Sequence, residues 1–114
     1  MADLTGRSII GFQAGGGGEP SIFGINPATG ESLQPGYAAV SEAELSRAAE
    51  LAADAFEVFG KTSSAARGAF LRKIANNIEA ISDDLARLAP QETGLPEGRI
   101  RMETGRTCGQ LRLF

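Results

Sequence analysis

Residues 41–60 read SEAELSRAAELAADAFEVFG, and from Ser41 onward the apolar residues recur with a helical period. Ser41 and Glu44 form an S-x-x-E capping box, in which each side chain can accept a hydrogen bond from a backbone amide of the first turn. The pattern predicts an amphipathic helix that ends at Gly60, with charged residues opposite the apolar face. The predicted apolar face consists of Leu45, Ala48, Ala49, Ala52, Ala53, Phe56 and Phe59.

A second helix is expected to begin near Ser63 or Ser64. Apolar residues again recur three to four positions apart, which is the spacing of one helix face. The buried face predicted for this helix consists of Phe70, Ile74, Ile78 and Ile81.

Two more helices complete the expected helical region. Ser82 resembles a new N-cap followed by two first-turn acids, which favours a break and a third helix through Thr93 that Gly94 closes. A fourth helix is expected to open around Pro96, a residue well suited to a first helical turn. One side of this helix would carry Ile100, Thr104, Thr107 or Cys108, Leu111 and Phe114.

The region before these helices has the composition of strands and turns. The segments RSIIGFQ (residues 7–13) and SIFGINP (21–27) are β-prone, and the glycine-rich segment AGGGGEP (14–20) between them is typical of a loop that joins hairpin strands. The segment NPATGE (26–31) combines a proline and a glycine in a predicted turn, and SLQPGYAAV (32–40) is a third extended piece. We therefore divide the chain into an N-terminal β-hairpin or extended region, residues 1–40, and a helical region, residues 41–114.

Composition limits the classes of function. The 114 residues suffice for one domain at most, and 42% apolar and 22% charged residues are ordinary for a globular protein. The net charge is −3 with scattered Lys and Arg, which argues against a nucleic-acid partner. No segment has the roughly 18–20 apolar residues of a membrane span. We also expect no signal peptide. One cysteine fits a reducing compartment, so a cytoplasmic location is expected.

Cys108 is the first candidate for chemistry, because a thiolate can act as a nucleophile. Its activation would need a nearby histidine, a cation or a helix N-terminus. The chain has no histidine, and Cys108 lies about three turns into its predicted helix. The side chains of Arg106 and Arg112 should project from other faces. A packed structural thiol is therefore the favoured interpretation.

The remaining candidates also have ordinary structural explanations. The glycine run in residues 14–20 lacks the G-x-G-x-x-G spacing of a phosphate-binding turn and precedes a strand-like segment, so a flexible turn is favoured. Asp83 and Asp84 are adjacent and should diverge on a helix, where first-turn acids complement the helix dipole. Glu92 and Glu103 are single carboxylates. We predict no catalytic, cofactor-binding or metal-binding residue within this chain.

Several segments nevertheless resemble the N-terminal region of the aldehyde dehydrogenase superfamily. They are NPATGE (26–31), AFEVFG (55–60), RGAFLRKIANNIE (67–79), ETGLPEGRI (92–100) and ETGRTCGQLRLF (103–114). The last two are similar to those of bacterial ketoglutarate semialdehyde (2,5-dioxovalerate) dehydrogenases and related fatty aldehyde dehydrogenases. The resemblance runs from about Phe12 to Phe114.

The resemblance implies an α/β fold with a Rossmann-like cofactor domain, a catalytic domain and an oligomerisation arm. Such enzymes oxidise an aldehyde to a carboxylate with NAD or NADP through a cysteine nucleophile and a glutamate base. In the family these groups, the oxyanion-stabilising asparagine and the cofactor loop all lie beyond the equivalent of Phe114. The match would therefore cover the N-terminal β-hairpin and three to four amphipathic helices of an incomplete cofactor-binding domain, and Cys108 does not correspond to the catalytic cysteine.

Two functions follow as hypotheses. The first is an N-terminal piece of a homo-oligomeric ketoglutarate semialdehyde dehydrogenase, which binds no cofactor alone, is inactive alone and has the remainder of the dehydrogenase chain as its partner. The second is a small interaction module that pairs with another protein through its apolar helix faces.

Overall fold

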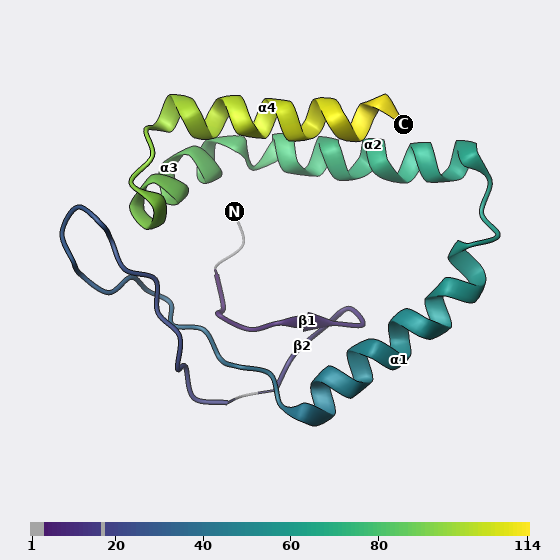
Figure 1. Ribbon diagram of the computed structural model, residues 1–114, viewed down its shortest axis with the longest axis horizontal. Helices are drawn as coiled ribbons and strands as arrows, with labels where there is room; N and C mark the ends of the chain where they lie inside the picture. The colour runs from purple at the N-terminus through teal and green to yellow at the C-terminus, as the bar shows by residue number, and fades with distance from the viewer. Residues whose placement is uncertain (1–3, 17) are drawn as a thin grey trace. The chain divides into compact units, whose positions relative to one another are not determined.

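The computed structural model describes residues 4–16 and 18–114, in which there are two short strands and four helices (Figure 1). The elements are β1 (Ile9–Ile10), β2 (Gln13–Ala14), α1 (Glu42–Phe59), α2 (Ser64–Ala80), α3 (Ser82–Thr93) and α4 (Glu97–Leu113). Residues 1–3 and Gly17 lie outside the described residues. The expectation of no signal peptide depends in part on the first of these, and the predicted glycine loop contains the second. Across the described residues, no helix is both long and apolar enough to cross a bilayer.

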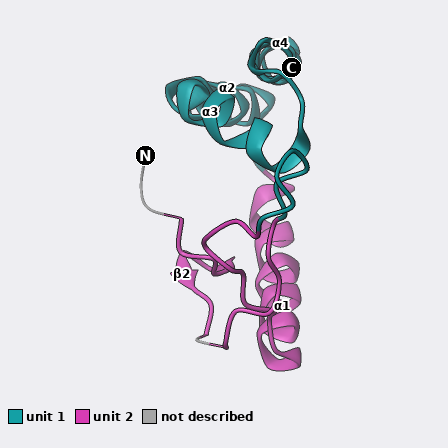
Figure 2. Cartoon of the chain, turned by 90° about the vertical axis from the view of Figure 1, so that its left-hand side faces the viewer, with its two compact units in different colours: residues 1, 25–31, 62–114 teal, residues 2–24, 32–61 magenta. Residues whose placement is uncertain are grey.

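The described residues form two compact units, which are coloured separately in Figure 2. One unit comprises residues 25–31 and 62–114, and therefore contains α2, α3 and α4. The other comprises the described residues of 4–24 and residues 32–61, and contains the hairpin and α1.

The hairpin closes at the start of the glycine run, since β2 ends at Ala14. Ile9 pairs with Ala14 and Ile10 with Gln13 in an antiparallel ladder. Gly11 and Phe12 both have positive φ, at 58° and 68°, as a two-residue type I′ connection requires. The prediction that residues 14–20 join the two strands of a hairpin was wrong. A two-residue turn already reverses the chain within the first β-prone segment.

The second β-prone segment pairs with the third. Ile22 and Tyr37 form an antiparallel bridge in which the Tyr37 amide donates to the Ile22 carbonyl at 2.7 Å. The predicted turn at 26–31 is confirmed: the Gly30 amide donates to the Asn26 carbonyl at 2.7 Å, and Gly30 has φ 76°. The Asn26 side chain also accepts from the Ala28 amide at 2.9 Å, which is a local hydrogen bond typical of Asn in turns.

Helix α1 begins as the sequence predicts. Ser41 is the N-cap, and both hydrogen bonds of the capping box with Glu44 are present. Gly60 ends the helix, but with φ −60° in the right-handed region rather than the left-handed conformation common after helices. The predicted apolar face is not buried: no residue of α1 is fully buried, and the Phe56 side chain is 73% exposed.

Helices α2 and α3 are separated by a single residue, Ile81. Ser63 caps α2 and accepts from the Ala66 amide at 3.1 Å, as predicted. The predicted N-cap Ser82 was wrong by one residue, because Ile81 occupies the cap position and Ser82 is already helical. The Ile81 carbonyl accepts the first α3 hydrogen bond from Leu85 at 3.0 Å, but its apolar side chain cannot accept one, so α3 has no side-chain cap. Gly94 closes α3 with φ 71°, as expected.

Small residues form the core of the unit that contains α2, α3 and α4. Figure 1 shows α2 and α4 side by side, and α4 also contacts α3. The most buried side chains there are Ala75 of α2, Ala86 of α3 and Cys108 of α4, with exposures of 0%, 1% and 1%. Small side chains at a helix contact let the backbones approach closely, so the larger residues of each face lie at its margins.

The expected helix faces are therefore partly correct. In α4, Cys108 is buried and Thr107 is exposed. Ile100, Thr104 and Leu111 are half-buried on the same side as Cys108. Phe114 was expected on this side and is 81% exposed. In α2, Ile74 and Ile78 are half-buried, but the expected core residues Phe70 and Ile81 are exposed.

Candidate functional site

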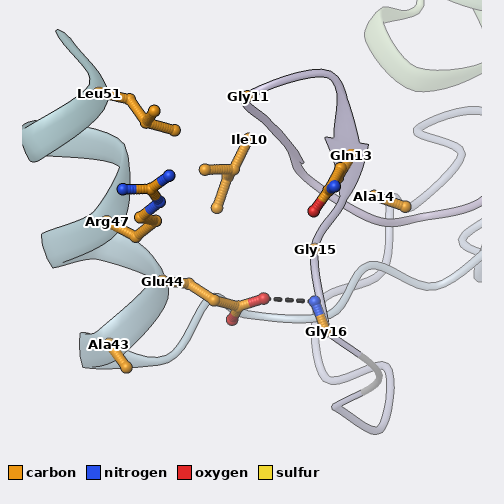
Figure 3. A pocket seen from close by; sticks show the side chains of 10 residues that line it. All are labelled: Ile10, Gly11, Gln13, Ala14, Gly15, Gly16, Ala43, Glu44, Arg47 and Leu51. Atoms are coloured by element: carbon orange, nitrogen blue, oxygen red, sulfur yellow. Dashed lines mark hydrogen bonds between the residues drawn. The ribbon is translucent and has the colours of Figure 1, made fainter. Parts of the chain in front are cut away.

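A hollow of about 370 Å³ lies between the hairpin and the first turns of α1 (Figure 3). Ile10 and Leu51 contribute apolar walls, and the glycines at 15 and 16 contribute backbone. Glu44 and Arg47, one helical turn apart, place one carboxylate and one guanidinium at the wall formed by α1. The hollow thus combines an apolar part with two opposite charges.

The Glu44 carboxylate is held by groups on both sides of it. Its Oε2 accepts from the Ser41 amide at 2.8 Å and from the Ser41 hydroxyl at 3.0 Å. Its Oε1 accepts from the Gly16 amide, the contact drawn in Figure 3. The Ser41 amide, the Gly16 amide and then the Ser41 hydroxyl lower the pKa of this carboxyl below its ordinary value. Glu44 is therefore an ionised structural group rather than a proton donor at neutral pH.

These contacts do not fit a nucleotide phosphate at the glycine run. A phosphate cradle presents backbone amides to the anion, but the Gly16 amide already donates to Glu44. The ionised carboxylate beside it would repel a phosphate. Arg47 lies 3.8 Å from Glu50, its neighbour on the exposed surface of α1. In the described residues of this hollow, the Gly16 amide is thus occupied by Glu44.

Cys108 lies at the contact of α4 with α2. Its Sγ is 3.5 Å from the Ala75 carbonyl oxygen, and the residue is 1% exposed. The prediction of a packed thiol is confirmed. The side chain of Arg112, one turn further along α4, is directed to Glu79 and Asn76 of α2.

The candidate carboxylates belong to separate ion pairs. Asp83 is 2.7 Å from Arg101 of α4, whereas Asp84 is 3.1 Å from Arg87 within α3. The hydrogen bond from Arg87 lowers the pKa of Asp84. The adjacent acids thus diverge, as predicted.

The two single carboxylates are also accounted for. Glu103 lies 2.6 Å from Arg99 on α4, and Glu92 is exposed on α3. Within residues 4–16 and 18–114, no group of three or more Cys, Asp or Glu side chains is arranged to hold a metal ion.

Sequence reasoning missed three long-range contacts. Glu44 bonds Gly16 across 28 positions, Arg101 bonds Asp83 across 18, and Arg112 bonds Glu79 across 33. The capping box predicted only the local contacts of Glu44. Nothing in the spacing of the arginines indicated their partners, because the pairing depends on how α3 and α4 fold back on α2.

Comparison with known proteins gives a consistent result. The family model described as the aldehyde dehydrogenase family matches residues 15–114. Alpha-ketoglutaric semialdehyde dehydrogenase 2 of Azospirillum brasilense is 44% identical over 112 residues, which cover 97% of this chain and 21% of that protein. Alpha-ketoglutaric semialdehyde dehydrogenase of Acinetobacter baylyi is 36% identical over 114 residues, which cover 100% of this chain and 22% of that protein.

A yeast relative extends the comparison beyond bacteria. Aldehyde dehydrogenase NAD(P)+ 1 of Saccharomyces cerevisiae is 38% identical over 77 residues, or 67% of this chain and 15% of that protein. The chain thus spans about a fifth of the length of the two bacterial relatives, at 21% and 22%. Because the family model matches residues 15–114, the chain belongs to the aldehyde dehydrogenase family.

Proposed function

We propose that this chain is the N-terminal portion of an NAD(P)-dependent aldehyde dehydrogenase that oxidises ketoglutaric semialdehyde to the dicarboxylate. The observation that carries the proposal is the 44% identity over 97% of the chain to a relative whose name states that substrate. The reaction consumes the aldehyde, water and NAD(P)⁺ and yields the carboxylate, NAD(P)H and two protons.

The proposed role of residues 4–114 is structural. We assign no catalytic, cofactor-binding or metal-binding residue to them. The Cys108 thiol is buried, Glu44 accepts hydrogen bonds, and Asp83 and Glu103 are ion-paired. NAD(P), when bound to the whole protein, supplies the hydride acceptor. The residues that carry out the chemistry are proposed to lie in the remainder of the dehydrogenase.

The finer architecture follows from the same resemblance. We propose that residues 1–40 form the N-terminal hairpin region and residues 41–114 the helical part of a Rossmann-like cofactor-binding domain. All four described helices fall in the second segment. We further propose a homo-oligomeric, cytoplasmic protein without nucleic-acid or membrane partners, in keeping with the net charge of −3 and the single cysteine.

Exchange of the matched segment tests the structural role. The matched 112 residues of the Azospirillum relative are replaced with this chain, and NAD(P)H formation from ketoglutaric semialdehyde is measured. We expect the chimaera to be active. We expect the Azospirillum relative without its matched segment, and the 114-residue chain by itself, to be inactive. Aldehyde oxidation by the chain alone would overturn the structural assignment, as would a folded but inactive chimaera.

The exposed apolar side chains of α1 favour a second candidate, an interaction module that functions with a separate partner protein. Phe56 and Val58 are each 73% exposed. An inactive chimaera, together with a cooperative thermal transition of a monomeric 114-residue chain, would support this candidate over a piece of a larger domain. Aggregation, relieved only when the rest of the relative is present, would support the dehydrogenase.

A further inference from the structure

The glycine run at residues 14–20 has no role in the proposed enzyme chemistry, yet two of its glycines lie against one side chain. The Gly15 amide donates to the Ser8 carbonyl at 2.7 Å and so extends the hairpin ladder beyond β2. The next amide, that of Gly16, donates to Glu44 Oε1 instead. The chain thus changes at Gly16 from pairing with the hairpin to binding a carboxylate of α1 (Figure 3).

A side chain at either position would crowd the Glu44 carboxylate. A Cβ atom at Gly15 would lie 3.0 Å from Glu44 Oε1, and one at Gly16 would lie 3.1 Å from the same oxygen. A Cβ at Gly18 would meet only ordinary contacts, the nearest at 3.7 Å from the Ala39 carbonyl oxygen. The absence of side chains at 15 and 16 therefore leaves room for the carboxylate.

The other oxygen of the same carboxylate completes the N-terminal cap of α1. Glu44 Oε2 accepts from the Ser41 amide and hydroxyl, while the Ser41 hydroxyl accepts from the Glu44 amide at 3.2 Å. One ionised group thus bonds two chain segments, and hydrogen bonds to an ionised acceptor are about twice as strong as neutral ones. If the segment at Gly16 moves away, the carboxylate loses the orientation that it needs to bond Ser41. If Ser41 moves away, the carboxylate loses the orientation that it needs to bond Gly16.

We propose that Glu44 is a latch that couples the ordering of the Gly15–Gly16 segment to the capping of α1. The segment is then an anion-binding backbone turn whose anion is part of the same chain. The latch is independent of the dehydrogenase assignment, since it requires only the contacts within residues 8–44. It replaces the flexible turn that the sequence predicts with a fixed connection between hairpin and helix.

Amide hydrogen exchange at residue 16 in the full chain tests the latch. Glu44→Ala is expected to accelerate exchange at Gly16 about tenfold, because it removes a hydrogen bond to a charged acceptor. Glu50→Ala, at an exposed position of the same helix, is the matched control and is expected to leave Gly16 unchanged. Equal acceleration in both variants, or none in Glu44→Ala, would overturn the proposal. So would unprotected exchange at Gly16 in the unsubstituted chain.

Two further variants distinguish coupling from general unfolding. Ser41→Ala keeps both the Gly16 amide and the Glu44 carboxylate but weakens the cap of α1. If the cap and the Gly15–Gly16 segment are coupled, amide exchange at Gly16 should be faster in this variant. No change there would contradict the coupling, even if Glu44→Ala unfolds. Gly16→Ala should accelerate exchange at positions 16 and 44, whereas Gly18→Ala should affect neither. A Gly16→Ala variant that behaves like Gly18→Ala would also overturn the proposal.

Discussion

Arg112 Nη2 of α4 lies 2.6 Å from Glu79 Oε2 and 2.8 Å from Asn76 Oδ1, so that one guanidinium contacts two residues on successive turns of α2. Hydrogen bonding to Glu79 raises the pKa of Arg112, and the reciprocal contact lowers the pKa of Glu79. The two helices are thus joined by a charged contact near the C-terminal end of α4 as well as by the small residues of their buried contact.

Arg112→Gln is expected to lower the midpoint of urea unfolding, since it removes the ion pair with Glu79 at the margin of the α2–α4 contact. Urea is preferred because it does not screen charges. The difference from the unsubstituted chain should shrink at about 1 M salt, where the Debye length is about 3 Å. Arg106→Gln, at an exposed position of α4, is the control. A loss of stability that does not depend on salt would indicate packing of the arginine stem instead.

Cys108 is expected to resist modification by a thiol reagent until the chain unfolds. Its residue is 1% exposed, and its sulfur faces the Ala75 carbonyl. Modification of the native chain should therefore be slower than that of the urea-unfolded chain by a large factor, set by the unfolding equilibrium. Equal rates in the two states would show that α4 does not pack on α2. Cys108→Ala should destabilise by about 1 kcal/mol, because a small cavity forms at the contact.

The same substitution is expected to have opposite effects at two glycines. Gly94 has φ 71° after α3, and a Cβ there would lie 3.1 Å from Pro27 Cγ, so Gly94→Ala should destabilise by about 1–2 kcal/mol. Gly105 lies within α4, where a Cβ would meet no atom within 4 Å, so Gly105→Ala should stabilise by about 0.5–1 kcal/mol. Thermal unfolding measures both. Destabilisation by Gly105→Ala would mean that α4 is not helical at this position.

Stability is expected to fall in acid. The folded-state pKa values of Glu44 and Glu79 lie below the ordinary value of 4.5, through hydrogen bonds from Ser41 and Gly16 and from Arg112. A lowered folded pKa means that the unfolded chain binds more protons, so this stabilisation is complete above pH 4.5 and is lost as the pH falls through the folded values. Glu79→Gln should flatten the acid limb of a plot of melting temperature against pH. An unaltered acid limb would show that the Arg112 contact does not form.

The local elements could be predicted because their causes are local. The capping box of Ser41 and Glu44, the cap at Ser63 and the end of the third helix at Gly94 each depend on residues within a few positions, and the structure confirms all three. The predicted break between α2 and α3 is confirmed, since Ile81 has φ −110° and ψ 13° and belongs to neither helix. The N-cap was wrong by one residue, because Ile81 takes the cap position although its side chain cannot accept a hydrogen bond.

The buried faces could be predicted only in part. Periodicity identified the side of α4 that carries Ile100 and Thr104, but it could not decide between Thr107 and Cys108, which lie three and four positions after Thr104 and so both fit the spacing of that face. It also placed Phe70 in the core, whereas the structure leaves it 53% exposed. The period shows which residues share a face, but the approach of a neighbouring helix determines how far each of them is covered.

The sequence by itself determined the four helices and the turn at 26–31, since each rests on short-range patterns. It also determined the membership of the aldehyde dehydrogenase family, which rests on a match over residues 15–114. Only the tertiary structure decided that Cys108 faces Ala75, that Arg112 binds Glu79, and that Gly16 donates to Glu44. These contacts join residues 28 to 33 positions apart. Such pairs meet only after α4 has packed on α2 and the hairpin on α1, and no local spacing encodes that packing.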